Sequence, residues 1–248
     1  MNRLISLIPA VSLFLSLGAL QPIFADALLV APTTSTGTNG ILAQQGLFGE
    51  GSNNVTFQWD LAGSQLTPMI GDPIDAIGFR LSAGSSDIGP TTYGTWNLEL
   101  SSSLNPIGSL STTFANNIAS NGVTVLSGPL NLGPVTGGSG PNPFFLINFT
   151  TPFTYTGGDL LMTLNVSNAS TFNIFDVDAN RVGDGLGDTV SQVPFLFGGQ
   201  PKAEFVNYPT TEFQYTPSPS TVPEPGSMFL LGSGLLAMSA LRRRRVLR

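Results

Sequence analysis

The chain has 248 residues and a formal net charge of −6, and it contains neither cysteine nor histidine. The missing residue types exclude disulfides, thiolate nucleophiles and metal sites built on cysteine or histidine, and they remove the commonest general base of hydrolases. With 29 glycines, 19 prolines and 10% charged residues, the composition is typical of turn-rich, all-β extracellular proteins.

Acidic and basic residues are distributed unevenly along the chain. Residues 28–222 contain 13 acidic and 3 basic residues, a formal charge of −10, whereas five arginines stand among the last seven residues. A negative field of this size repels phosphate backbones and anionic lipids, and it attracts divalent cations. Nucleic acid is therefore not an expected partner.

Residues 1–27 have the three parts of a secretory signal peptide. Arg3 supplies the positive start, residues 4–20 are apolar, and Ala25-Asp26-Ala27 forms a small-x-small cleavage site. Pro9 interrupts the apolar run, which argues against the alternative of a permanent N-terminal anchor. We expect export by the general secretory machinery and cleavage by signal peptidase after Ala27, with cleavage after Ala25 as the alternative.

Residues 28–215 alternate short apolar-patterned runs with clusters of Gly, Pro, Asn and Ser. In the run 55–61, Val55, Phe57, Trp59 and Leu61 share one face, and the same period of two recurs at 77–81 and 96–100. Further strands are expected at 123–127, 144–150, 160–166, 170–177, 203–208 and 211–215. The sequence therefore predicts an all-β fold, a single antiparallel β-sandwich of jelly-roll type, followed by a Pro/Ser spacer at 216–222.

An acidic, glycine-rich stretch late in the body is a candidate calcium site. It places Asp176, Asp178, Asn180 and Asp184 within nine residues, and such oxygen ligands suit Ca²⁺. The fit to an EF-hand loop is poor, because Arg181 stands where that loop needs glycine and Gly187 where it needs a bidentate glutamate. The alternative is a solvated Asp/Gly turn that follows a strand ending near Val177. Apart from this structural Ca²⁺, we expect no cofactor.

Aromatic and acidic side chains suggest two alternative functions for the body, carbohydrate binding and glycoside hydrolysis. Tyr93, beside Gly94, is predicted to be exposed and could stack on a sugar ring of an extracellular polysaccharide, whereas Trp96 is in register with Leu98 and Leu100 and is expected in the core. A glycoside hydrolase would need two carboxylates facing one cleft. The candidates for such a pair are Asp72, Asp75, Glu99, Glu204 and Glu212, and their spacing selects none of them.

The C-terminal segment combines three features. Val222, Pro223, Glu224 and Pro225 form an extended, proline-bracketed tetrad, residues 228–241 form an uncharged apolar run, and Arg242, Arg243, Arg244 and Arg245 follow directly. A helix of 14 residues rises about 21 Å, which is short of a hydrocarbon core of about 30 Å. We therefore expect a short transmembrane helix that spans by thinning the bilayer and by snorkelling of the arginines. The arginines should stop transfer and stay cytoplasmic, which places the tetrad on the outer side of the membrane.

This order of parts, over residues 223–248, resembles the PEP-CTERM sorting signal of Gram-negative bacteria. The resemblance implies recognition by the membrane enzyme exosortase, a membrane-tethered intermediate, cleavage near the Pro-Glu-Pro element and a final location at the cell surface or outside the cell. It also implies an association with exopolysaccharide and biofilm. We therefore expect a non-catalytic surface or matrix protein; a carbohydrate-binding module, a glycoside hydrolase and an unprocessed C-terminal anchor remain alternatives.

Overall fold

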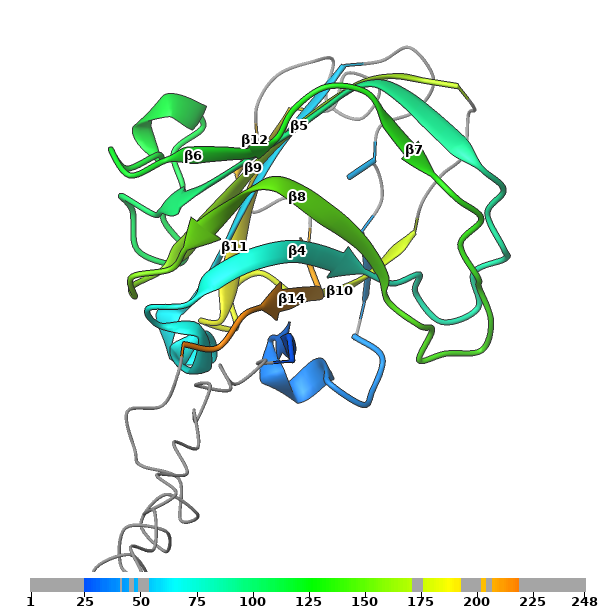
Figure 1. Ribbon diagram of the computed structural model, residues 1–248, viewed down its shortest axis with the longest axis horizontal. Coiled ribbons are helices and arrows are strands. Elements are labelled where there is room, and N and C mark those ends of the chain that lie inside the picture. Colours follow the sequence, from blue (N-terminus) through cyan, green and yellow to red (C-terminus); the bar gives the residue numbers. More distant parts are fainter. Residues whose placement is uncertain are drawn as a thin grey trace, which may run out of the picture.

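Strands provide nearly all of the regular structure in the computed structural model (Figure 1). The structure describes residues 25–40, 42–44, 47–48, 54–170, 176–192, 202–203 and 207–218. The strands are β1 (Ala27–Ala31), β2 (Leu42–Gln44), β3 (Val55–Leu61), β4 (Pro73–Phe79), β5 (Thr91–Ser102), β6 (Val123–Leu126), β7 (Leu130–Leu132), β8 (Phe145–Thr154), β9 (Leu160–Ala169), β10 (Val177–Asn180), β11 (Gly187–Gln192), β12 (Lys202–Ala203), β13 (Tyr208–Pro209) and β14 (Thr211–Tyr215). The helical elements of this described part are short 3-10 turns, η1 (Thr33–Ser35), η2 (Gly63–Gln65), η3 (Thr67–Met69) and η4 (Phe114–Asn116).

The strands form three sheets, and every strand pairing among the described residues is antiparallel. One sheet, here called the smaller sheet, has the order β1-β14-β4-β8. The other main sheet, here called the larger sheet, has the order β12-β11-β3-β9-β5-β6 with β7 beside β5. A small third sheet has the order β13-β10-β2. Figure 1 shows β14, β4 and β8 as one layer in front of β11, β9 and β5. The prediction of an antiparallel all-β body is confirmed.

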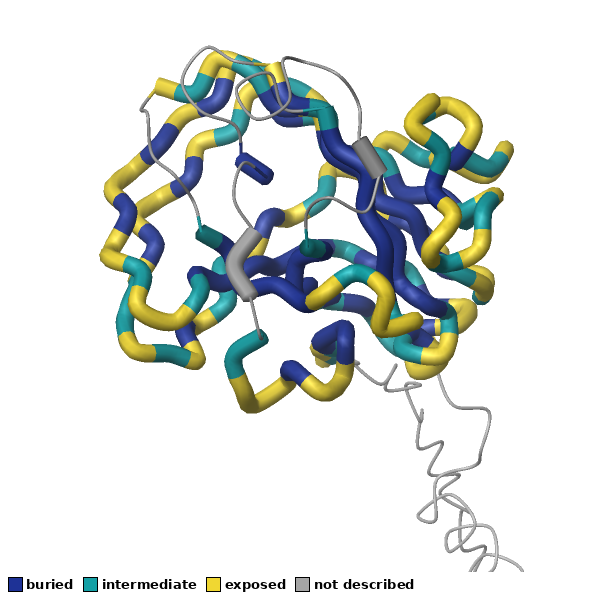
Figure 2. Tube along the Cα trace, turned by 180° about the vertical axis from the view of Figure 1, so that it is seen from behind, coloured by how far each residue is buried: buried dark blue, intermediate teal, exposed yellow. Residues whose placement is uncertain are grey.

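The main core lies between these two layers and is rich in aromatic side chains. Val55, Phe57, Trp59 and Leu61 of β3 are at most 1% exposed, as their alternation predicts. Trp59 meets Phe79 of β4, with ring centroids 6.0 Å apart, which joins the larger sheet to the smaller one. Figure 2 shows buried residues concentrated along the strands and exposed residues in the loops.

A second, smaller cluster lies on the outer face of the larger sheet. Residues 103–118, here called the cover loop, run from the end of β5 and fold over β9 and β11. Leu110 of this loop packs with Leu161 of β9 and Val190 of β11. The partly buried Phe114 and Ile118, also of the cover loop, pack against the same cluster. The cover loop therefore closes one part of the outer sheet face to solvent.

Seven of the nine predicted strands coincide with observed strands, from the run at 55–61 to the run at 211–215. The predictions at 170–177 and 203–208 lie partly outside the described residues, and the structure places β10 and β13 at their ends. The sequence reasoning missed β11. Its sequence, GDTVSQ, carries polar residues on both faces of the strand, which hides the usual alternation. Both faces are nevertheless buried, because the cover loop lies over the outer face.

Candidate functional site

The two ends of the described body lie together at one edge of the smaller sheet. β1 pairs with β14 in antiparallel register, and Ala27 lies opposite Tyr215. The pairing continues past β14, because the Thr216 N–H donates to the Pro73 carbonyl at 3.0 Å. The segment that follows the signal peptide and the segment that precedes the C-terminal tail therefore leave the body at the same place.

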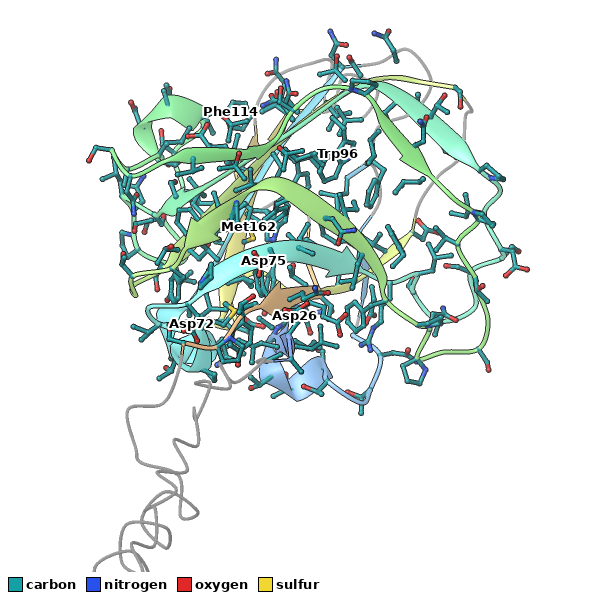
Figure 3. All side chains as sticks on the ribbon, in the orientation of Figure 1. Asp26, Asp72, Asp75, Trp96, Phe114 and Met162 are labelled. Carbon is teal, nitrogen blue, oxygen red and sulfur yellow. The ribbon has the colours of Figure 1, made fainter. Side chains whose placement is uncertain are left out.

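Three aspartates hold this junction (Figure 3). Asp26 accepts a hydrogen bond from Gln214 Nε2 at 2.8 Å, and Asp75 Oδ2 accepts one from Thr216 Oγ1 at 2.8 Å. Asp72, which is 7% exposed, accepts the Ser218 N–H at 2.7 Å. The described part of the predicted spacer, residues 216–218, is thus bound to the body.

This junction also bears on the boundary of the signal peptide. β1 begins at Ala27, one residue before the mature start expected from cleavage after Ala27. Asp26 is bonded to Gln214 and lies 3.3 Å from Thr216 Oγ1. Cleavage after Ala25, the alternative expected from the sequence, would keep these contacts. The position of the cut stays a prediction, and only the alternative keeps Asp26 in the mature chain.

The sorting residues themselves lie outside the described residues. These are Val222, Pro223, Glu224 and Pro225, the apolar run 228–241, and the arginine block Arg242, Arg243, Arg244 and Arg245. Within the described ranges, no helix has both the length and the apolar character needed to cross a membrane.

The predicted calcium ligands are engaged with other groups. Asp178 of β10 forms a buried ion pair with Arg80, with 2.6 Å between Arg80 Nη2 and Asp178 Oδ2 and side-chain exposures of 2% and 1%. Arg80 also donates to the carbonyl groups of Ser35 and Thr38, and its guanidinium lies 4.8 Å from the ring centroid of Phe144. Asp178 Oδ1 accepts the Gly40 N–H at 2.7 Å. The charge of Asp178 is therefore already neutralised.

The remaining members of that set are dispersed. Asn180 bonds to Ser35 and Thr210, and Asp184 accepts the Tyr208 hydroxyl at 2.6 Å. Asp176 Oδ1 is buried without a hydrogen-bond partner. Within the described residues, no three acidic side chains are grouped so that they could hold a metal ion. Calcium at this stretch stays a prediction, without support from the geometry.

Tyr93 is buried, so the predicted exposure of this residue was wrong. Its side chain is 2% exposed and lies beside Phe48, with ring centroids 6.4 Å apart. Burial raises the pKa of its hydroxyl group above the ordinary value. Trp96, expected in the core, is fully buried. The other described tyrosines, Tyr155, Tyr208 and Tyr215, are at most 8% exposed, so none offers a flat ring face to a sugar.

The carboxylates considered for glycoside hydrolysis do not share one described site. Asp72 and Asp75 hold the start of the spacer. Glu212 is partly buried in β14. Burial raises the pKa of its carboxyl group, and the positive charge of Arg80 lowers it by a smaller amount. Glu99 lines a groove on the outer face of the larger sheet. Glu204 lies outside the described residues.

Two polar grooves on that outer face were not anticipated. The first is lined by Asn97 and Glu99 of β5 and Thr163 and Asn165 of β9, and the second continues past Asn165 along β3 and β9. Thr56 Oγ1 donates to Asn165 Oδ1 at 2.9 Å between the two strands. Along these strands, the groove residues alternate with buried residues and therefore face outward. This alternation in the sequence could have located them.

The tail matches a known family. Residues 221–245 match the PEP-CTERM protein-sorting motif, which confirms the resemblance inferred from the tetrad, the apolar run and the arginine block. The match covers 25 of the 248 residues. It marks the chain as an exported protein that exosortase processes at the membrane. Neither a curated protein nor a solved structure matched the chain.

Proposed function

Because the chain carries a PEP-CTERM protein-sorting motif, we propose that it is a non-catalytic protein of the cell surface or extracellular matrix, associated with exopolysaccharide and biofilm. A jelly-roll-like β-sandwich is exported, held in the membrane by the apolar run 228–241, and released when exosortase cuts near Pro223-Glu224-Pro225. The match at residues 221–245 is the observation that carries this proposal.

The junction of the body with the tail supports this route. Since β1 and β14 are paired, the sandwich can complete its fold while both ends of the chain are still held at one membrane. The body extends to Ser218 through the bond to Asp72, and Glu224 lies six residues further on. Six extended residues reach about 20 Å at most. Exosortase must therefore act close to the end of the folded body at which β14 finishes.

Substitution of the motif tests the proposed sorting. We expect Glu224→Ala and Pro223→Ala to leave a larger, membrane-bound form in the cells that produce the protein, because the extended ribbon and its charge are what the protease reads. Pro219→Ala, in the same spacer but before the match, is the control and should be processed like the wild type. Normal processing of both motif variants would refute cleavage directed by this motif.

Carbohydrate binding is a second candidate function, favoured by the two polar grooves. Asn97, Glu99 and Asn165 place amide and carboxylate groups along an open face, and such groups hydrogen-bond to sugar hydroxyls. If the grooves bind the matrix polysaccharide, Glu99→Gln combined with Asn165→Ala should reduce retention on polysaccharide from the same cells. Asn131→Ala, an exposed asparagine on β7, is the matched control. Equal retention of all variants would remove this candidate.

A further inference from the structure

Two buried carboxylates face each other on the outer side of the larger sheet. Asp60 of β3 lies directly opposite Asp188 of β11 in the strand register. Both side chains are fully buried. Among the described residues, neither forms an ion pair, since the ion pair found there joins Arg80 to Asp178. Two like charges have thus been removed from water without a basic partner, which is strongly unfavourable.

The hydrogen bonds available to this pair do not compensate for it. Asp188 accepts the N–H groups of Leu110 at 3.1 Å and Thr189 at 2.7 Å. Asp60 Oδ2 accepts the Ser103 hydroxyl at 3.2 Å, whereas Asp60 Oδ1 is buried without a hydrogen-bond partner. The partly buried Asp159 adds a third negative charge to the surroundings of Asp60. A positive species is therefore required.

The pair lies beneath the cover loop, which brings further oxygen atoms to it. Ser103 Oγ, already near Asp60, lies 2.8 Å from the Asn105 carbonyl oxygen. Carboxylate, hydroxyl and backbone carbonyl oxygens are the ligands that Ca²⁺ takes in proteins, with water filling the remaining positions. Such a site needs only two acidic residues, and it is therefore consistent with the finding that no three acidic side chains are grouped in the described part.

We propose that Asp60 and Asp188 bind a divalent cation of the calcium type, with Ser103 Oγ and the Asn105 carbonyl oxygen as further ligands. The two carboxylates belong to adjacent strands, and the other two ligands belong to the cover loop. The cation thus fixes the cover loop onto the sheet, beside the polar groove that contains Glu99 and Thr163. This site is separate from the acidic stretch around Asp176 that the sequence suggested.

The rival occupant of the pair is a proton. Burial, and next the charge of Asp188, raise the pKa of the Asp60 carboxyl group to about 8, against the lowering effects of the Ser103 hydrogen bond and of the Asp188 backbone N–H. Without a cation, Asp60 would then be protonated at neutral pH. Because this pKa lies above its unfolded value, a proton-only pair would stabilise the fold most below about pH 4 and lose that contribution as pH rises through 8.

Thermal unfolding of the full chain in a mild detergent, followed by tryptophan fluorescence, distinguishes these occupants. After removal of metal with EGTA, 10 mM Ca²⁺ should raise the Tm of the wild type by roughly 3–10 °C, given an affinity of about 10⁻⁴–10⁻³ M, as in extracellular modules. Asp60→Asn and Asp188→Asn should each abolish this rise. Asp176→Asn and Asp184→Asn are the matched controls and should keep it.

Two results would overturn the proposal. One is a wild type that does not respond to Ca²⁺, together with an Asp60→Asn variant that is as stable as the wild type or more stable, since asparagine mimics a protonated carboxyl group. The other is loss of the response in Asp176→Asn or Asp184→Asn alone. If Asp60→Asn does not fold, Tb³⁺ emission from the wild type, excited through the neighbouring Trp59, still distinguishes a bound cation from a proton. Emission that Ca²⁺ displaces supports the site, and its absence refutes it.

Discussion

Replacement of Arg80 by methionine should destabilise the body more than any change of a surface charge. Methionine keeps an unbranched apolar stem but removes the guanidinium group and the charge that compensates the buried Asp178. It also removes the donors to the carbonyl groups of Ser35 and Thr38. Removal of one partner from a buried ion pair costs about 3–5 kcal/mol. With a urea dependence of about 2 kcal/mol per molar, the unfolding midpoint should fall by about 1.5–2.5 M.

Urea unfolding followed by tryptophan fluorescence measures this change, because Trp59 and Trp96 are both fully buried. Arg181→Met is the matched control: Arg181 is exposed and follows the same strand β10, so its loss should change the free energy of unfolding by less than about 0.5 kcal/mol. Adding Asp178→Asn to Arg80→Met should restore part of the lost stability, since no uncompensated charge remains. Equal midpoints for Arg80→Met and Arg181→Met would refute the reasoning.

Three further predictions concern the core, a close backbone approach and the N-terminus. Phe57→Ala should cost about 3–5 kcal/mol in urea unfolding, because it opens a cavity in the main core, and a cost below 1 kcal/mol would contradict the assigned core. Gly187→Ala should cost about 1–3 kcal/mol, since its Cβ would lie 2.8 Å from the Tyr208 ring, whereas Gly133→Ala meets open space and should be nearly neutral. N-terminal sequencing of the exported protein should find Asp26 first; Leu28 as the first residue would show that the Asp26–Gln214 contact is absent from the mature protein.

The alternation of residues predicted most of the strands, because one-sided burial imposes a period of two on the sequence. Tyr93 shows where this argument fails. Counted from Trp96 in steps of two, Tyr93 belongs to the outer face, yet both side chains are buried and both lie beside Phe48. The burial pattern of β5 changes phase at Gly94 and Thr95. The alternation of residues in the sequence does not show where the buried face of a strand changes in this way.

The acidic residues show a second limit of local sequence. Asp178 was grouped with Asp176 and Asn180 by spacing, but its partner Arg80 is 98 residues away in the chain. Asp60 and Asp188 are likewise distant in sequence and meet only through the β3–β11 register. By contrast, the sorting motif at residues 221–245 was recognised from the sequence, because its parts are read in the order of the linear chain. Sites built across strands require the register, and the sequence alone does not supply it.

The mass of the intact surface-located protein tests the sorting of this chain most directly. It should be measured in cells with exosortase and in cells from which the exosortase gene has been deleted. We predict that the protein from the first cells ends close to the Pro223-Glu224-Pro225 element and lacks the arginine block 242–245. The second cells should keep that block on a membrane-bound chain. A surface protein that retains Arg245 in the presence of exosortase would contradict the account.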